Sequence, residues 1–145
     1  MAEKVKVSCQ NCGTTNFYPV GTQGKSVVCG KCREILPEPG KVVAPSPSQA
    51  FNLIHRSALP VLVDFYSPTC MPCQVMHPVV ERLAMRRAGE LMVMRVNVAD
   101  HPELSAAFGI KGVPTFVILH KGNERGRTTG AVDETHFALW VASLA

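Results

Sequence analysis

The chain has 145 residues, of which 46% are hydrophobic, so it can form one ordinary core with a small additional segment. Its net charge of +4 is mild, and its nearest basic cluster, Arg82, Arg86 and Arg87, is interpreted as a solvated helix face rather than a nucleic-acid contact. No apolar stretch is long enough for a membrane span, and the first residues lack a signal peptide's apolar core. We therefore expect a cytoplasmic, reducing location, where cysteines more often bind metal or catalyse than form structural disulfides.

Four of the six cysteines form two pairs near the N-terminus: Cys9, Cys12, Cys29 and Cys32. Their spacing, C-x2-C-x16-C-x2-C, is typical of a four-cysteine zinc site, and Gly13 and Gly30 allow the tight turns that such a site requires. Residues 1–40 have few large apolar side chains, so bound metal would have to stabilise them. Two further redox pairs or two disulfides are the alternative reading. Compartment and spacing favour zinc, and the segment resembles a zinc ribbon.

Residues 41–145 are expected to form a second domain. It begins with a proline-rich linker at 41–47 that contains a short strand at 41–43. Ser48 is then expected to cap a helix that ends near Ser57.

A buried strand is predicted over 61–66, because this run is short, β-branched and aromatic. Apolar residues then recur at three- and four-residue spacing over 75–84, which predicts a helix. Cys70 would lie at the N-terminus of that helix, where free N–H groups and the helix dipole favour a thiolate. We expect Cys70 to attack and Cys73, one turn further in, to resolve the mixed disulfide. Metal ligation and two inert buried thiols are less favoured, because a C-x-x-C motif between a strand and a helix is typical of redox sites.

The rest of the chain alternates between strands and helices. The order from residue 41 is strand, helix, strand, helix, strand, helix, strand, strand, helix, and right-handed crossovers make its first part a parallel sheet with a late antiparallel hairpin. The later elements are strands at 91–98, 116–120 and 125–129, a turn at 121–123, a helix between Asp100 and Gly109, and a helix capped by Asp133.

Several of these stretches together resemble the thioredoxin family. They are Cys70-Met71-Pro72-Cys73, Asp64, Pro78, Gly112-Val113-Pro114-Thr115 and Gly130. The resemblance covers roughly residues 42–145, and with the N-terminal ribbon the chain is similar to the zinc-containing, thioredoxin-2 type of bacteria. It implies an α/β thioredoxin fold, a mixed sheet with a parallel core and an antiparallel hairpin flanked by helices.

Asp64 is an acid in an otherwise apolar strand. Burial disfavours its charged form, so its pKa should rise and it can exchange protons. The resemblance assigns that exchange to Asp64 and Cys73. Arg95 stands where the family often has a lysine paired with this acid.

The resemblance also implies a cis peptide bond before Pro114, with the Val113 backbone pairing with an extended substrate. Two positions depart from the family pattern. Thr69 replaces a usual tryptophan and Met71 a usual glycine, and we expect both to contact substrate and to affect the reduction potential. His77 shares a helix face with Cys73, but a metal site there is disfavoured, and the other four histidines are expected on the surface.

The leading hypothesis is therefore a monomeric protein-disulfide reductase with a structural zinc ion and no directly bound organic cofactor. The resemblance implies disulfide-containing protein substrates and reduction by an NADPH-dependent, flavin-containing thioredoxin reductase. Two alternatives stay open: a more oxidising, isomerase-like protein, and a zinc-dependent binding or redox-sensing module that loses its metal on oxidation.

Overall fold

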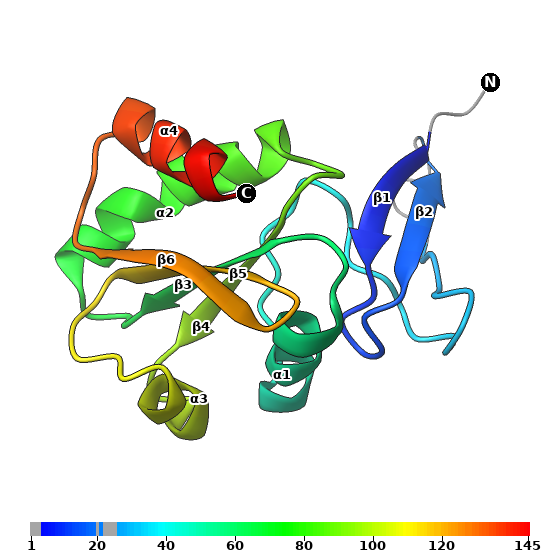
Figure 1. The fold of residues 1–145 in the computed structure, drawn as a ribbon, viewed down its shortest axis with the longest axis horizontal. Coiled ribbons are helices and arrows are strands. Elements are labelled where there is room, and N and C mark those ends of the chain that lie inside the picture. Colours follow the sequence, from blue (N-terminus) through cyan, green and yellow to red (C-terminus); the bar gives the residue numbers. More distant parts are fainter. Residues whose placement is uncertain (1–3, 20, 22–25) are drawn as a thin grey trace.

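The computed structural model describes residues 4–19, 21 and 26–145 of the chain (Figure 1). Its elements, in chain order, are β1 (Lys4–Ser8), β2 (Thr15–Pro19), α1 (Pro47–Arg56), β3 (Val61–Tyr66), α2 (Met71–Arg86), β4 (Met92–Asn97), α3 (Pro102–Ala107), β5 (Thr115–His120), β6 (Asn123–Thr129) and α4 (Glu134–Leu144).

The main sheet has four strands in the order β4-β3-β5-β6. Strand β3 pairs in parallel with β4 and antiparallel with β5, which in turn pairs antiparallel with β6. The β5–β6 turn is short because Lys121 and Gly122 both have positive φ angles, of 53° and 82°. The sheet is therefore mixed, with the parallel pair and the late hairpin that the sequence predicts.

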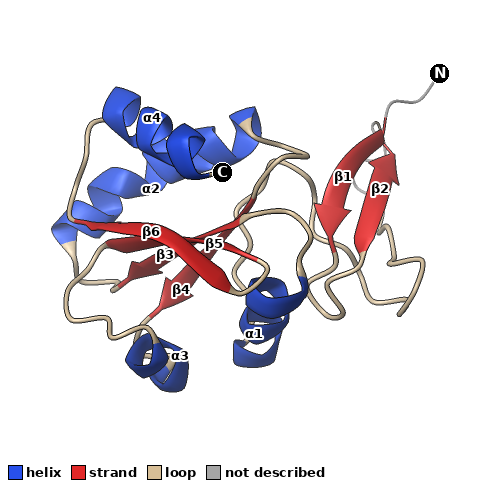
Figure 2. Ribbon diagram, in the orientation of Figure 1, coloured by secondary structure: helices blue, strands red, loops and turns tan. Residues whose placement is uncertain are grey.

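Helices cover both faces of this sheet (Figure 2). Helices α2 and α4 lie on one face, and α1 and α3 lie on the other. Successive side chains of β3 point to opposite faces, so Leu62 packs in the core beneath α2 while Val61 and Val63 join the core on the α1 side. Asp64 has the same parity as Leu62, which places it on the face covered by α2.

The N-terminal hairpin of β1 and β2 forms a separate two-stranded sheet that packs beside α1 (Figure 1). Apolar residues of this segment, including Val7 and Leu36, belong to the same buried cluster as Leu53 of α1. The buried Ser8 and Ser57 hydroxyl groups form a hydrogen bond of 2.7 Å across the junction. The segment before residue 41 therefore shares a core with the rest of the chain.

The linker is tied to the sheet at one point. Val43 forms an isolated parallel bridge with Met94, with the Val43 N–H donating to Val93 O at 2.8 Å and the Arg95 N–H donating to Val43 O at 2.9 Å. The short strand expected at 41–43 is thus reduced to this single bridge.

Two predicted helix caps are misplaced. Helix α1 is capped by Ser46 and not by Ser48: Ser46 Oγ accepts from the Gln49 N–H, and the Gln49 side chain accepts from the Ser46 N–H at 2.9 Å. Pro47 follows directly, at the position where its missing N–H costs nothing. Helix α3 begins after His101, which makes no side-chain cap, so Asp100 is not the cap. Asp133 caps α4 as predicted.

Two other expectations also need correction. His101 is buried, with 6% of its surface exposed, whereas a surface position was expected. Val75 was placed on the apolar stripe of α2, but it is 59% exposed.

The solvated helix face holds ion pairs: Arg82 and Arg86 both contact the Glu134 carboxylate, at 2.8 and 2.6 Å.

Candidate active site and metal centre

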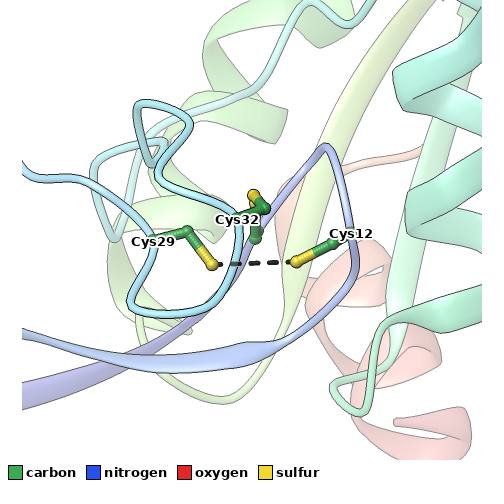
Figure 3. Close-up of side chains that lie close together, drawn as sticks. Cys12, Cys29 and Cys32 are labelled. Atoms are coloured by element: carbon green, nitrogen blue, oxygen red, sulfur yellow. Dashed lines mark hydrogen bonds between the residues drawn. The ribbon is translucent and has the colours of Figure 1, made fainter.

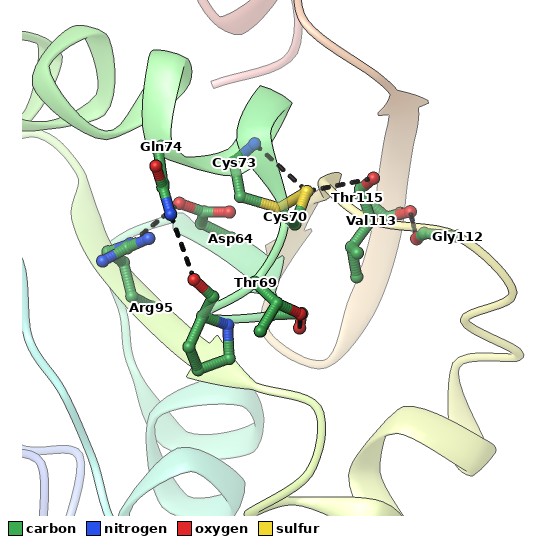
Figure 4. The surroundings of a disulfide bond; sticks show 11 residues. Asp64, Thr69, Cys70, Cys73, Gln74, Arg95, Gly112, Val113 and Thr115 are labelled. Atoms are coloured by element: carbon green, nitrogen blue, oxygen red, sulfur yellow. Dashed lines mark hydrogen bonds and ion pairs between the residues drawn. A yellow bond between two sulfur atoms is a disulfide. The ribbon is translucent and has the colours of Figure 1, made fainter.

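Cys70 and Cys73 form a disulfide at the start of α2 (Figure 4). Cys70 is the N-cap residue of the helix, and its Sγ accepts a hydrogen bond from the Cys73 N–H at 3.2 Å. Pro72 lies in the first turn, where a helix tolerates proline. The positive end of the helix dipole is therefore directed at the Cys70 sulfur.

The two sulfurs differ in accessibility. Cys73 is 1% exposed, whereas Cys70 is only half-buried. Thr69 is exposed, and Met71 has 67% of its surface exposed. An incoming disulfide would therefore reach Cys70 before Cys73, and would meet Thr69 and Met71 beside it.

A loop before β5 faces the disulfide. The carbonyl oxygen of Val113 lies 3.6 Å from Cys70 Sγ, and the peptide bond between Val113 and the buried Pro114 is cis, as expected. The Thr115 hydroxyl donates to Gly112 O at 2.6 Å and fixes the turn of this loop (Figure 4). The structure thus brings the Val113 backbone next to the accessible sulfur.

Asp64 lies in β3 close to the disulfide (Figure 4), with 1% of its surface exposed. Burial raises the pKa of this carboxyl, and the Arg95 guanidinium acts in the opposite direction. Burial has the larger effect, so the pKa is about 6, above the ordinary value of 3.8. Arg95 Nε lies 3.2 Å from Oδ2, while Oδ1 has no hydrogen-bond partner among the described residues. The Arg95 guanidinium also stacks over Tyr66, 3.8 Å from the ring centroid.

A pocket of about 270 Å³ opens beside Cys73. The sequence did not predict it, because its walls come from β3, α2 and β4, which are distant in the chain. The only available signal was the four-residue spacing that puts His77 on the same face as Cys73. The pocket is lined by Tyr66, Ser67, Pro68, Cys73, Gln74, His77 and Arg95.

The other four cysteines converge in the N-terminal segment. Their Sγ atoms all lie within 4.8 Å of one another. Cys12 and Cys29 are 3.7 Å apart between sulfurs (Figure 3), and Cys9 and Cys32 are 3.6 Å apart. None of the four forms a disulfide.

Both cysteine pairs have the same backbone turn. The Gly13 N–H donates to Cys9 O at 2.8 Å, and the Arg33 N–H donates to Cys29 O at 3.0 Å. These donors have φ angles of 76° and 70°. The sequence predicts that Gly30 allows the second turn. The residue with the left-handed conformation in that turn is instead Arg33. Two such turns facing each other direct four sulfurs at one point.

The thiols of the cluster differ in how readily they ionise. Burial raises the pKa of Cys9 to about 12. Burial acts in the same direction on Cys29, but the backbone N–H groups of Cys32 and Lys31 and the Asn16 amide outweigh it and lower its pKa to about 6. Four soft sulfur donors with no carboxylate or imidazole among them fit a tetrahedral zinc ion. The residues present therefore fit the metal that the spacing predicts.

An α/β domain with a C-x-x-C disulfide at a helix N-terminus, opposite a cis-proline loop, defines a thiol-disulfide oxidoreductase. The family model described as Thioredoxin matches residues 41–143, and the chain therefore belongs to the thioredoxin family. Thioredoxins reduce disulfide substrates and are themselves reduced by thioredoxin reductase.

Individual relatives agree with this assignment. Thioredoxin C-3 of Corynebacterium nephridii is 29% identical over 135 residues, which cover 93% of this chain and 92% of the relative. Thioredoxin 1 of Synechococcus elongatus is 37% identical over 59% of this chain and 79% of its own length. A mutant thioredoxin from Halobacterium salinarum has a similar solved structure, with a TM-score of 0.65 and 28% identity over 74% of this chain and 94% of that one. No helix in the described ranges is long and apolar enough to cross a membrane.

Proposed function

We propose that the chain is a protein-disulfide reductase whose attacking thiol is Cys70 and whose resolving thiol is Cys73. The Cys70 thiolate attacks one sulfur of a substrate disulfide, forms a mixed disulfide, and releases the other substrate sulfur as a thiol after protonation. Cys73 then loses its proton and attacks Cys70 Sγ. The mixed disulfide breaks, the second substrate thiol leaves, and the Cys70–Cys73 disulfide remains.

The observation that carries this proposal is the asymmetry of the two sulfurs. Cys70 is half-buried at the helix N-terminus, and its Sγ accepts the Cys73 N–H, an arrangement that stabilises a thiolate. Cys73 is 1% exposed, so an external disulfide cannot reach it directly. A buried second thiol, 5.2 Å from the first between Cα atoms, suits an intramolecular attack.

Asp64 is proposed as the proton acceptor for Cys73. A carboxyl group with a pKa of about 6 is present in both protonation states near neutral pH, as proton exchange requires. Val113 is proposed to pair through its backbone with an extended substrate segment next to Pro114. Thr69 and Met71 would contact the side chains of that segment.

Residues 1–40 are proposed to form a zinc-binding domain and residues 41–145 the thioredoxin domain, with 41–47 as the connection. Cys9, Cys12, Cys29 and Cys32 would hold one zinc ion, which would stabilise their turns and take no part in electron transfer. This matches the zinc-containing type of thioredoxin that the sequence resembles.

An NADPH-dependent thioredoxin reductase is the proposed electron donor, and disulfide-containing proteins are the proposed substrates. The proposed setting is a monomer in the cytoplasm. A more oxidising, isomerase-like protein is the second candidate, because Met71 lies between the two cysteines and the residues there affect the reduction potential. A zinc-dependent redox-sensing or binding module is the third.

The test is NADPH-dependent reduction of a disulfide protein, coupled to a thioredoxin reductase, by the wild type and two variants. Cys70→Ser should lose turnover. Cys73→Ser should accumulate a mixed disulfide through Cys70, visible by intact-protein mass spectrometry. If Cys70→Ser keeps full activity, or if the adduct forms at another cysteine, the assignment is wrong. If the wild type and both variants bind partner proteins but none of the three reduces the disulfide protein, the binding-module candidate replaces the reductase.

A further inference from the structure

The pocket beside Cys73 connects the inner thiol of the active site to a histidine at the surface. Cys73 and His77, one turn apart on α2, both line it. His77 Nε2 lies 2.9 Å from the Glu81 carboxylate, in an ion pair whose side chains are 41% and 55% exposed. Its other ring nitrogen, Nδ1, is buried and has no hydrogen-bond partner among the described residues. One ring nitrogen of His77 therefore pairs with an exposed carboxylate, while the other ring nitrogen is buried and unpaired among the described residues.

The buried acid alone does not complete proton transfer with the solvent. Asp64 is 1% exposed and does not line the pocket, although its partner Arg95 does. A proton taken from Cys73 must leave the interior before the next catalytic cycle. The pocket, at about 270 Å³, is large enough for several water molecules, and its polar lining groups can hold them.

A histidine suits this position chemically. Imidazole can accept a proton at one ring nitrogen while it releases another proton from the second, and histidine ordinarily changes charge between about pH 5 and pH 8. Five other titratable or charged groups line the pocket or pair with a residue that lines it. They are Asp64 and Tyr66 on β3, Arg95 on β4, and Cys73 and Glu81 on α2.

We propose that His77 is the proton outlet of the resolving step, a role that rests on the proposed function of Cys73. The Cys73 thiol proton, which the proposed function gives to Asp64, passes on through pocket water to His77 Nδ1, and the Nε2 proton passes to Glu81 and the solvent. The Cys73 thiolate then attacks Cys70 Sγ, the bond between Cys70 and the substrate sulfur breaks, and the departing thiolate takes a proton from water. His77 acts through water, so it is a positioning and relay residue.

The experiment is stopped-flow reaction of the reduced, zinc-loaded protein with dithiobis-nitrobenzoate, followed by the absorbance of the released thionitrobenzoate. The first release reports attack by Cys70 and depends on reagent concentration. The second reports resolution by Cys73 and does not. His77→Ala and His77→Gln are compared with the wild type across about pH 5 to pH 8. His136→Ala is the matched control, because His136 is also paired with a carboxylate, Asp133, but lies on α4.

The expected result is a second release about 10-fold slower near neutral pH in both His77 variants, with the first release unchanged. Added imidazole should restore the rate, and the control should behave as the wild type. Unchanged second release in the His77 variants would overturn the proposal, as would equal slowing of both steps without imidazole rescue, because that pattern indicates a structural role. If Cys73→Ser still gives both releases, the proposed function itself fails, whatever the His77 variants do.

Discussion

Asp64 and Arg95 face each other across the parallel strands β3 and β4, and Arg95 Nε lies 3.2 Å from Asp64 Oδ2. An ion pair normally lowers the pKa of a carboxyl group, yet here burial outweighs the cation and raises it to about 6. The acid close to the dithiol is therefore poised between its two protonation states at the pH where thiol-disulfide exchange takes place.

Replacement of Asp64 by asparagine should make stability less dependent on pH. Because the folded-state pKa of about 6 lies above the ordinary value of 3.8, the folded protein binds more protons than the unfolded chain between these values. The wild type's free energy of unfolding should therefore fall as the pH rises through this window. Relative to the wild type, Asp64→Asn should gain roughly 1 to 3 kcal/mol between about pH 4 and pH 7.

Urea unfolding of the two oxidised proteins at both pH values measures this gain. The comparison removes every pH-independent effect of the substitution, including the loss of the ion pair with Arg95. A relative stability that falls with rising pH would mean that the Asp64 pKa is lowered in the folded state.

The packing of the N-terminal segment against α1 can be tested at a glycine. Gly13 has a φ angle of +76°, and a Cβ atom there would lie 2.2 Å from Arg56 Cβ. Gly21 has a φ angle of +89° with nothing within 4 Å, so it offers the same backbone strain without the contact. Gly21→Ala should cost about 1 to 2 kcal/mol. Gly13→Ala should cost a further 1 to 3 kcal/mol or so, because backbone atoms must move.

Thermal and urea unfolding measure both variants, and hydrogen exchange of α1 shows where the effect lies. Increased exchange in α1 is expected for Gly13→Ala alone. Equal costs for the two glycine variants would show that the added Cβ atom at position 13 does not clash with Arg56, and would contradict the close packing of the N-terminal segment against α1.

Removal of the metal should destabilise more than the N-terminal segment. Cys9 and Cys29 are fully buried in the same cluster as Leu53 and Ile54 of α1. Loss of the ion should therefore lower the midpoint of thermal unfolding for the whole chain. We expect one zinc per chain by elemental analysis in the wild type and in the control Cys70→Ser, and none in Cys29→Ser. Full zinc content in Cys29→Ser would contradict the site.

The capping box of α1 gives a sharper local test. Ser46→Ala removes the hydroxyl that accepts from the Gln49 N–H and should cost about 1 kcal/mol. Ser48→Ala is the matched control, because Ser48 is exposed and lies inside the first turn, and its hydroxyl, 3.3 Å from Ser46 Oγ, is not the group that caps the helix. It should change the free energy of unfolding little. A larger cost at Ser48 would mean that α1 begins two residues later.

Local sequence patterns predicted most of the fold because they follow from local physics. The apolar run of β3 and the three- and four-residue spacing of α2 depend on neighbours in the chain, and both elements form as predicted, although Val75 of that spacing is exposed. The capping error at α1 came from competing serines, since Ser46 and Ser48 are both good caps, and Pro47 at N1 with Gln49 at N3 distinguishes Ser46. The four zinc-type cysteines were recognised from spacing alone, and the structure brings their sulfurs together.

Features made by distant segments were not predictable in the same way. The hydroxyl pair of Ser8 and Ser57 joins residues 49 positions apart, and no local pattern indicates which surface the N-terminal segment covers. The burial of His101 has the same origin, since its surroundings come from other elements. The pocket beside Cys73 also depends on the register that places Arg95 opposite Asp64.

The most direct test of the reductase assignment is a redox titration of the zinc-loaded protein in glutathione and dithiothreitol buffers. Alkylation and mass spectrometry would follow Cys70 and Cys73 separately from the four cysteines of the metal centre. The account predicts one two-electron transition of this pair with a midpoint near roughly −270 mV, the value typical of thioredoxins. A midpoint near roughly −180 mV, typical of protein disulfide isomerase, would contradict it and favour the isomerase-like alternative.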